Sequence, residues 1–309
     1  MLSHRHNWLA LAVLLLPGIL AIGISNDLPS ARYRSAAAEV RIPFFATDED
    51  GRSIDTVNKE DFAVVDNELV VRNFRSFSRS GETALDIVAV VDVSESVAPR
   101  LRVGMHDVLQ LLSHNQPVSD DRSDDRISVM SFAGGQPAVI CSGNCRGPAA
   151  QSRLVALQAA GATRLFDAVA FGADFISHRG APGVKPVLIL FSDGDDTSSR
   201  TSLGEALQAA IASNAAIYSV DLGNPENPSD GSRILQQMSE ATGGRYFPIH
   251  QGAASVLKDV IEDLHASYVV TYQLPSLRPG FHSLRLLPAH NLNLKFHCRN
   301  GYYYENSAP

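Results

Sequence analysis

Runs of apolar residues recur through the middle of the chain, and their spacing predicts strands and helices in alternation. Ile87 to Val91 are consecutive, apolar and mostly β-branched, which is typical of a strand covered on both faces. Leu101, Met105, Val108 and Leu112 recur at the spacing of one helical face. Further strands are predicted at 126–133, 187–191, 215–220 and 245–249, with 136–140 as a hairpin partner of the first, and further helices at 165–176, 203–212, 234–242 and 253–266. This alternation predicts an α/β fold with a doubly wound, mainly parallel sheet.

Both ends of this region give way to short strands separated by turn residues. The predicted strands are 40–46, 61–67 and 70–77 on the N-terminal side, and 268–274, 282–287 and 294–304 on the C-terminal side. Neither set is large enough for a core of its own. We therefore expect residues 39–82 and 268–309 to pack together as a small flanking β module, with a domain of residues 83–267 inserted between them.

The first 25 residues have the pattern of a targeting segment. Arg5 precedes residues 8–24, which carry no charge, and the small residues Ala21, Gly23 and Ser25 suit cleavage. The uncharged stretch is shorter than the roughly 20 residues that span a bilayer as a helix. A signal peptide and a membrane anchor both remain open, followed by a linker at 26–38. Either reading places the rest of the chain outside the cytoplasm.

Composition narrows the function classes. Hydrophobic residues make up 45% of the chain and charged residues 19%, which is typical of a globular protein. The formal net charge of -7 argues against a nucleic-acid partner, because phosphate binding needs a basic surface. Cys141 and Cys145 are separated by Ser-Gly-Asn, so a disulfide between them is plausible in an oxidising compartment; idle thiols are the alternative. Cys298 is left over.

Oxygen-bearing side chains follow the strand at 87–91. Asp92, Ser94 and Ser96 stand where open α/β sheets place their ligands, at the carboxyl end of a strand. One carboxylate and two hydroxyls suit a hard cation such as Mg²⁺. Thr163, just before a predicted helix, and Asp193, just after a second apolar strand, are candidates for the remaining ligands.

The motif Asp92-x-Ser94-x-Ser96, with Thr163 and Ser192-Asp193-Gly194 further along the chain, resembles the metal-ion-dependent adhesion site of von Willebrand factor type A domains. The β segments on either side resemble the layout of related exported bacterial proteins. The resemblance implies that Ser94, Ser96 and Thr163 are hydroxyl ligands, and that Asp92 and Asp193 bind the ion directly or through water.

Simpler roles stay open for each of these residues. Ser94, Ser96 and Thr163 could cap helices, and Asp193-Gly194 could be a plain turn. Two positions depart from the commonest family pattern. Glu95 adds a negative charge between the serines, and Ala162 stands where a glycine is frequent before the threonine.

Elsewhere, a loop contains acids that we interpret as solvated rather than calcium-binding, at Asp120, Asp121, Asp124 and Asp125.

These observations favour a non-enzymatic protein-binding or adhesion module outside the cytoplasm. The resemblance implies Mg²⁺, with Mn²⁺ or Ca²⁺ as alternatives, and a partner protein that presents an Asp or Glu carboxylate. A membrane contact is expected only through the N-terminal segment, if it is not cleaved. The alternatives are a structural module with a vestigial site and a metal-dependent hydrolase. The chain has no G-x-S-x-G, P-loop or H-E-x-x-H motif.

Overall fold

A computed structural model describes residues 39–80, 83–114, 125–143, 145, 147–181, 183–224, 226, 229–248 and 253–304. The predicted leader (1–25), the linker (26–38) and the acids Asp120, Asp121 and Asp124 lie outside these residues. None of the described helices has the length and apolar character needed to cross a membrane.

The middle of the chain forms a six-stranded sheet, as the alternation of strands and helices predicted. Its strand order is β11 (Tyr246–Phe247), β10 (Ala216–Asp221), β9 (Lys185–Ser192), β6 (Leu85–Asp92), β7 (Arg126–Phe132) and β8 (Ala138–Cys141). All neighbours run parallel except β8, which pairs antiparallel with β7 at one edge. The chain turns to opposite sides of β6 to form β7 and β9, so β6 lies at the topological switch point.

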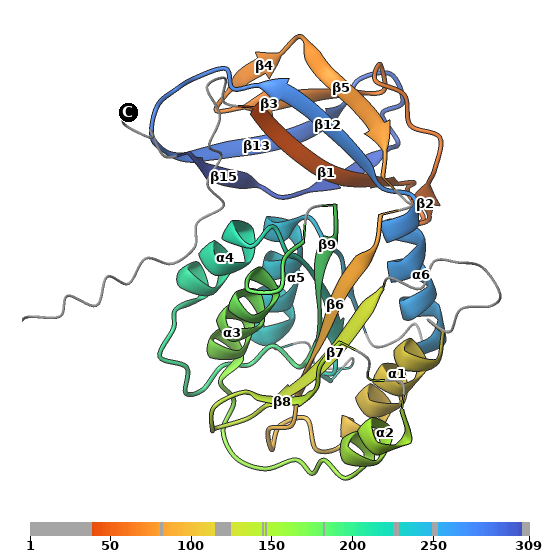
Figure 1. The fold of residues 1–309 in the computed structure, drawn as a ribbon, viewed down its shortest axis with the longest axis vertical. Coiled ribbons are helices and arrows are strands. Elements are labelled where there is room, and N and C mark those ends of the chain that lie inside the picture. The colour runs from red at the N-terminus through yellow and green to blue at the C-terminus, as the bar shows by residue number, and fades with distance from the viewer. Residues whose placement is uncertain are drawn as a thin grey trace, which may run out of the picture.

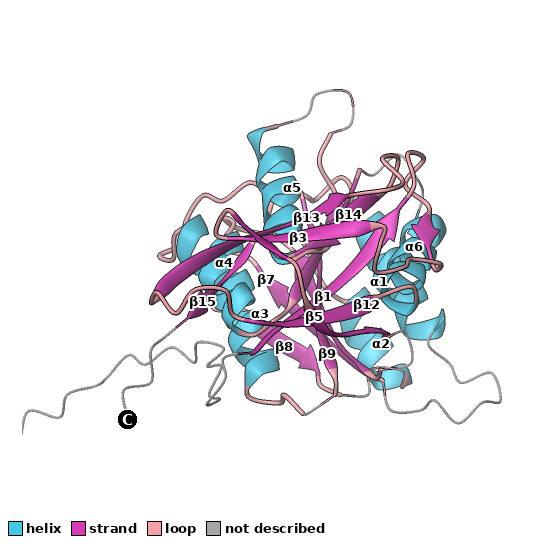
Figure 2. Cartoon of the chain, turned by 90° about the horizontal axis from the view of Figure 1, so that it is seen from above, coloured by secondary structure: helices cyan, strands magenta, loops and turns pink. Residues whose placement is uncertain are grey.

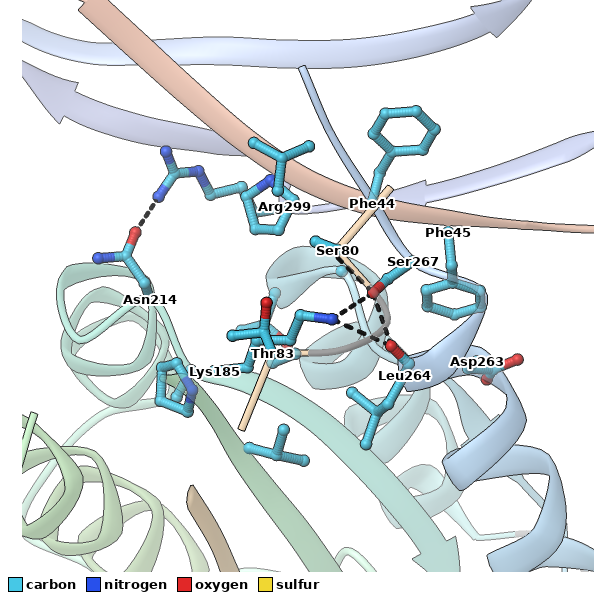
Figure 3. Close-up of a pocket in the computed structure, with 18 of the residues that line it drawn as sticks. Phe44, Phe45, Ser80, Thr83, Lys185, Asn214, Asp263, Leu264, Ser267 and Arg299 are labelled. Carbon is cyan, nitrogen blue, oxygen red and sulfur yellow. Dashed lines mark hydrogen bonds between the residues drawn. The ribbon is translucent and has the colours of Figure 1, made fainter. Parts of the chain in front are cut away.

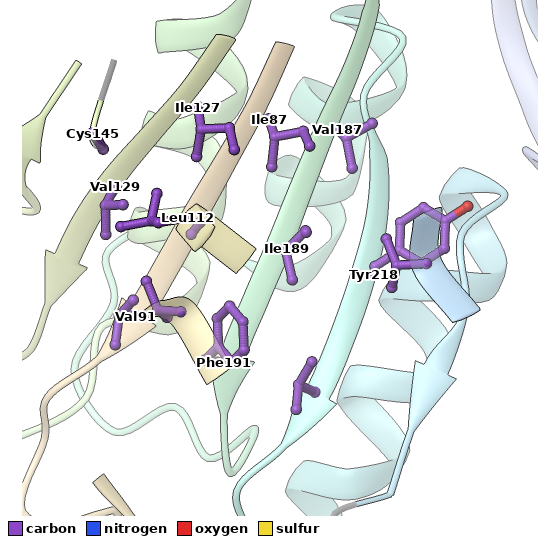
Figure 4. Packing of buried hydrophobic residues seen from close by; sticks show 14 of the residues in the cluster. Ile87, Val91, Leu112, Ile127, Val129, Cys145, Val187, Ile189, Phe191 and Tyr218 are labelled. Carbon is purple, nitrogen blue, oxygen red and sulfur yellow. The ribbon is translucent and has the colours of Figure 1, made fainter. Parts of the chain in front are cut away.

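Helices cover both faces of this sheet (Figure 1). One face carries α1 (Leu101–His114), α2 (Pro148–Val155) and α6 (Ala253–His265), and the other carries α3 (Leu165–Ser177), α4 (Leu203–Ala212) and α5 (Asp230–Thr242). Every residue of β6 is buried. Ile87, Ala89 and Val91 pack into the first core (Figure 4), while Val88 and Val90 pack into the second. This double covering explains why residues 87–91 of the strand are all apolar.

Strands from the two ends of the chain form a β-sandwich. One sheet has the order β14 (Lys295–Cys298), β1 (Glu39–Thr47), β12 (Tyr268–Gln273) and β5 (Phe74–Arg79), with β2 (Ser53–Ile54) attached to β1. The other has the order β15 (Gly301–Tyr304), β13 (Gly280–Pro288), β3 (Phe62–Asp66) and β4 (Leu69–Val71). C-terminal and N-terminal strands alternate in the first sheet, and in the second the C-terminal strand β13 pairs with the N-terminal strand β3. Neither end could therefore form the sandwich without the other.

The sandwich rests on the end of the central sheet where its strands begin (Figures 1 and 2). Successive side chains of β1 point to opposite faces of the strand, which explains how the sandwich is joined to the central domain. Ile42 and Phe44 point into the sandwich core, whereas Phe45 packs into the core of the central domain, with its ring 6.2 Å from that of Tyr218. The carboxyl ends of β6 and β9 therefore lie at the edge away from the sandwich.

Several predicted boundaries were wrong. The apolar stretch 70–77 is two strands in different sheets, because Arg72 and Asn73 separate β4 from β5. The stretch 294–304 is likewise divided into β14 and β15. Helix α2 was not predicted, although Pro148 stands at its start, a favoured position for proline.

A disulfide joins Cys141, at the end of β8, to Cys145. Cys145 is fully buried in the core beneath α1 and α2. The third cysteine, Cys298, is not in a disulfide.

Candidate metal centre

Asp92 is the last residue of β6 and is completely buried. Its Oδ1 accepts a hydrogen bond from the backbone N–H of Ser94 at 2.8 Å, and its Oδ2 accepts one from the Ser192 hydroxyl at 2.6 Å. The carboxylate is therefore fixed in position by β6 itself and by the neighbouring strand β9.

The two serines that follow present their hydroxyls to each other. Ser94 is buried and Ser96 is exposed, and their Oγ atoms lie 3.0 Å apart. Helix α1 begins only at Leu101, so neither serine is its N-cap. Mg²⁺ binds oxygen at 2.0–2.1 Å in an octahedron, which puts neighbouring ligand atoms about 3.0 Å apart. The spacing of the two hydroxyls fits that geometry.

Thr163 lies in the loop that leads into α3 and is buried. Its backbone N–H donates to the Thr197 hydroxyl at 2.9 Å, and its carbonyl accepts from the N–H groups of Thr197 and Ser198, each at 3.0 Å. None of these bonds uses the Thr163 hydroxyl. The N-cap of α3 is Arg164, without a side-chain cap, so Thr163 does not cap this helix.

Two backbone hydrogen bonds tie the serine loop to the threonine loop. The N–H of Glu95 donates to the Gly161 carbonyl at 3.0 Å, and the N–H of Ala160 donates to the Val93 carbonyl at 2.9 Å. The Glu95 side chain is exposed. These bonds hold together segments that are more than sixty residues apart in the sequence.

Asp193 follows β9 and is nearly buried. Gly194 has a positive φ of 81°, and a Cβ at this position would collide with the Gly231 carbonyl at the start of α5. The Asp-Gly pair lies in an irregular loop that is pressed tightly against α5, and the plain turn of the simpler reading does not form. This packing fixes the direction in which Asp193 leaves the strand.

The site has an excess of negative charge. Burial raises the pKa of Asp92 to about 6, and the nearby charge of Asp193 adds to the rise. Burial and Asp193 also raise the pKa of Asp195. Among the described residues, neither Asp92 nor Asp193 forms an ion pair with a lysine or arginine. A cation would relieve this repulsion.

The donor set determines which cation fits. The described residues contain no group of three or more His, Cys, Asp or Glu that could hold a metal. The candidate set has instead two carboxylates and three hydroxyls, all of them oxygen donors. This chemistry fits Mg²⁺ and does not fit a zinc site built from sulfur and imidazole.

Sequence reasoning missed the residues that hold these ligands in place. The motif includes Ser192, but it does not include Thr197 or Ser198. Asp196 accepts hydrogen bonds from the Ser199 hydroxyl at 2.5 Å and from the Phe166 N–H at 3.3 Å. The run of small hydroxyl residues after Asp196 was the available signal, because such residues favour hydrogen bonds to loop backbone.

The solved structures to which this chain is similar include three bacterial proteins. An aerotolerance-related membrane protein from Bacteroides fragilis NCTC 9343 is 16% identical with a TM-score of 0.47, covering 59% of this chain and 98% of its own. BatB from Bacteroides thetaiotaomicron is 14% identical with a TM-score of 0.45, covering 58% and 97%. A von Willebrand factor type A protein from Catenulispora acidiphila is 12% identical with a TM-score of 0.45, covering 89% and 76%. No curated protein sequence matched.

The family comparison agrees with the fold and with the motif. Residues 86–263 match the von Willebrand factor type A domain, a stretch that runs from β6 into α6 and includes every candidate ligand. The chain belongs to the von Willebrand factor type A domain family, as its sequence motif predicted.

Proposed function

We propose that this protein is a metal-dependent, non-enzymatic protein-binding module that acts outside the cytoplasm. Domains of its family are generally interaction modules and commonly bind a divalent metal. The observation that carries the proposal is the 3.0 Å spacing of the Ser94 and Ser96 hydroxyls beside the buried carboxylate of Asp92.

In this proposal Ser94, Ser96 and Thr163 hold Mg²⁺ through their hydroxyls, and Asp92 and Asp193 hold it directly or through water. The bound cation would supply a coordination position for an Asp or Glu carboxylate of the partner. Neutral hydroxyls make most of the donor set, so an incoming carboxylate meets less repulsion than it would from five acids. Mn²⁺ and Ca²⁺ use the same donor chemistry and are alternatives.

The environment of Asp92 argues against a hydrolase. A nucleophilic carboxylate must reach the substrate, yet Asp92 is fully buried and both of its oxygens accept hydrogen bonds. Residue 94 is a serine, whereas aspartyl-phosphate enzymes usually carry a second acid there. We therefore assign Asp92 a role in positioning the ion and its ligands.

Two features support a location outside the cytoplasm. The first 25 residues have the pattern of a signal peptide or membrane anchor. The disulfide between Cys141 and Cys145 suits an oxidising compartment, since such bonds are rare in the cytosol.

Calorimetric titration of the chain from Glu39 onward with Mg²⁺, Mn²⁺ and Ca²⁺ tests the proposal. We expect saturable binding of one ion to the wild type. Ser94→Ala and Thr163→Ala should each lose about tenfold or more in affinity, the effect that even outer-shell partners of a metal have. Ser177→Ala is the matched control, because Ser177 lies at the far end of α3 and its hydroxyl bonds only to the Asp174 carbonyl.

A pull-down of partner proteins should then depend on the metal. Chelator and Ser94→Ala should each abolish capture that wild type and Ser177→Ala achieve. If a folded wild type binds none of the three ions, the metal-dependent mechanism is wrong. A structural module with a vestigial site would then be the better reading, and partner capture should resist chelator.

A further inference from the structure

A cavity of about 430 Å³ lies where the sandwich meets the central domain (Figure 3). Its floor is formed by the first residues of β9 and β10 and by the end of α6, and its roof by β1 and β12. Its volume lies in the range of sites for small organic ligands, which is roughly 300–1,000 Å³. The candidate metal centre is at the other end of the sheet.

Most of the cavity wall is apolar. Pro43 and Phe45 on β1 form one side of the cavity, and Pro186 on β9 continues the surface. The exposed residues Gly183 and Asn214 also line the cavity, so it opens to solvent. This wall suits a hydrocarbon or aromatic body and offers such a body few hydrogen bonds.

Lys185 places an ammonium group within this apolar wall. Lys185, half-buried at the start of β9, donates from Nζ to the Leu264 carbonyl at 3.0 Å and to the Ser267 hydroxyl. Both partners are neutral, and no carboxylate of the described residues lies within ion-pair distance of Nζ. An ammonium has three protons to donate, so one remains for a ligand.

Other charges at the cavity do not neutralise Lys185. The acid that lines the cavity, Asp263, pairs with Arg245 at 3.2 Å and accepts a bond from the Ser53 hydroxyl. Arg41 and Arg299 also line the cavity. Burial, and then repulsion from Arg41, lower the pKa of Lys185 to about 8, as expected of an ammonium without a counterion.

We propose that this cavity binds a small amphipathic carboxylate, with the anion on Lys185 and the apolar body against Pro43 and Phe45. The single remaining ammonium proton of Lys185 suits one oxygen of a singly charged carboxylate. A neutral apolar molecule would fill the same wall but leave the cation uncompensated. The site is independent of the proposed metal centre.

Calorimetric titration of the full chain with octanoate, and separately with octan-1-ol, tests this proposal. Octanoate should bind the wild type at one saturable site, and octan-1-ol should bind at least about tenfold more weakly, since a charge-assisted hydrogen bond is lost. Lys185→Met should weaken octanoate to the level of octan-1-ol. Lys258→Met, a matched change at an exposed lysine of α6, should bind octanoate like the wild type.

A second measurement does not depend on how the variants fold. Nuclear Overhauser contacts from the octanoate chain to the ring protons of Pro43 and Phe45 are expected in the wild-type complex. Ser94→Ala should bind octanoate normally, which separates this site from the metal centre. Absence of saturable octanoate binding, equal binding by folded Lys185→Met, or contacts elsewhere than these rings would each overturn the proposal.

Discussion

Asp92 is a buried carboxylate at the end of β6. The charge of a second carboxylate, Asp193 after the end of β9, acts on it. Burial raises its pKa to about 6, with Asp193 adding to the rise. In the folded protein without a metal, the neutral acid is therefore favoured only below about pH 6, and at neutral pH the carboxylate is ionised against the cost of burial. Ionised Asp92 destabilises the fold, so the residue is placed for binding and not for stability.

Replacing Asp92 with asparagine should therefore stabilise the protein in chelator at pH 7.5. A carboxyl whose pKa rises on folding makes the protein less stable as the pH increases from about 4 to above about 6. The amide does not ionise, so Asp92→Asn should gain about 1–3 kcal/mol of unfolding free energy. Denaturant melts in chelator measure this gain.

Magnesium should reverse the order of the two proteins. The ion should raise the melting temperature of the wild type and leave Asp92→Asn unchanged, because the asparagine lacks the charge that holds the cation. Asp174→Asn, at an exposed position of α3, is the matched control and should behave like the wild type. A variant that is less stable than the wild type in chelator would mean that Asp92 is a structural residue.

His297 lies where the sandwich meets the central domain, and its burial should make the folded protein less stable in acid. Its ring stacks on Phe45 at 4.5 Å, and its Nε2 is 2.9 Å from the Thr47 hydroxyl. Burial, and then the charges of Lys295 and Arg245, lower its pKa to about 3. In the unfolded chain His297 is therefore protonated below about pH 6.5, whereas in the folded protein it stays neutral until about pH 3. The free energy of unfolding falls as the pH decreases below about 6.5.

His297→Gln should remove this part of the pH dependence while keeping a hydrogen-bonding group near Thr47. The difference in unfolding free energy between wild type and variant should shrink by about 1–3 kcal/mol from pH 7.5 to pH 4.5, allowing for partial exposure. Urea melts at a series of pH values measure it. Other buried groups titrate equally in both proteins and cancel in the difference, so parallel curves would contradict the assignment.

The sequence could identify candidate ligands because each one directly borders a predicted strand or helix. It could not identify the residues that fix them. Ser192 bonds to Asp92 across one hundred residues of chain, and Thr197 bonds to the backbone of Thr163 across thirty-four. Such contacts depend on which strands are neighbours in the sheet, which hydrophobic periodicity does not reveal.

At the scale of elements, the small loop after β8 depends on its disulfide. Reduction, or Cys141→Ala, should lower the unfolding free energy by about 2 kcal/mol, since a short closed loop restricts the unfolded chain. Urea melts with and without reductant measure the loss. Reductant should have no further effect on Cys141→Ala. A wild type equally stable in reductant would show that burial of Cys145 alone holds the loop.

Elements with a strong period were predicted well, and short ones were not. Helix α4 was placed at its observed bounds, 203–212, and its N-cap Ser202 forms a capping box with Glu205. The missed helix α2 buries only Ala150 and Leu154, too few positions for a helical period to stand out. The boundary between β4 and β5 depends on the sheet that each strand joins. Those pairings are tertiary contacts, which the local sequence does not reveal.

At the scale of the whole molecule, the two ends of the chain meet around a buried acid of the sandwich. The Oδ2 of Asp66 on β3 accepts hydrogen bonds from Tyr272 of β12 at 2.7 Å and from Tyr302 of β15 at 2.5 Å. Its Oδ1 lies 3.3 Å from Nδ1 of His282 on β13. The network joins both sheets of the sandwich, and Figure 1 places the sandwich away from the carboxyl ends of β6 and β9.

Stability and metal binding should therefore respond to different substitutions. Asp66→Ala removes the carboxylate oxygen that accepts hydrogen bonds from two buried tyrosine hydroxyls, which should cost about 2–4 kcal/mol of unfolding free energy. Its Mg²⁺ affinity, measured by calorimetry below the melting transition, should stay within about twofold of the wild type. Ser94→Ala should show the opposite result, with stability changed by less than about 1 kcal/mol and Mg²⁺ affinity lost. A folded Asp66→Ala protein with weakened Mg²⁺ binding would instead show that the sandwich and the metal centre are energetically coupled through the central sheet, because no residue is common to the two sites.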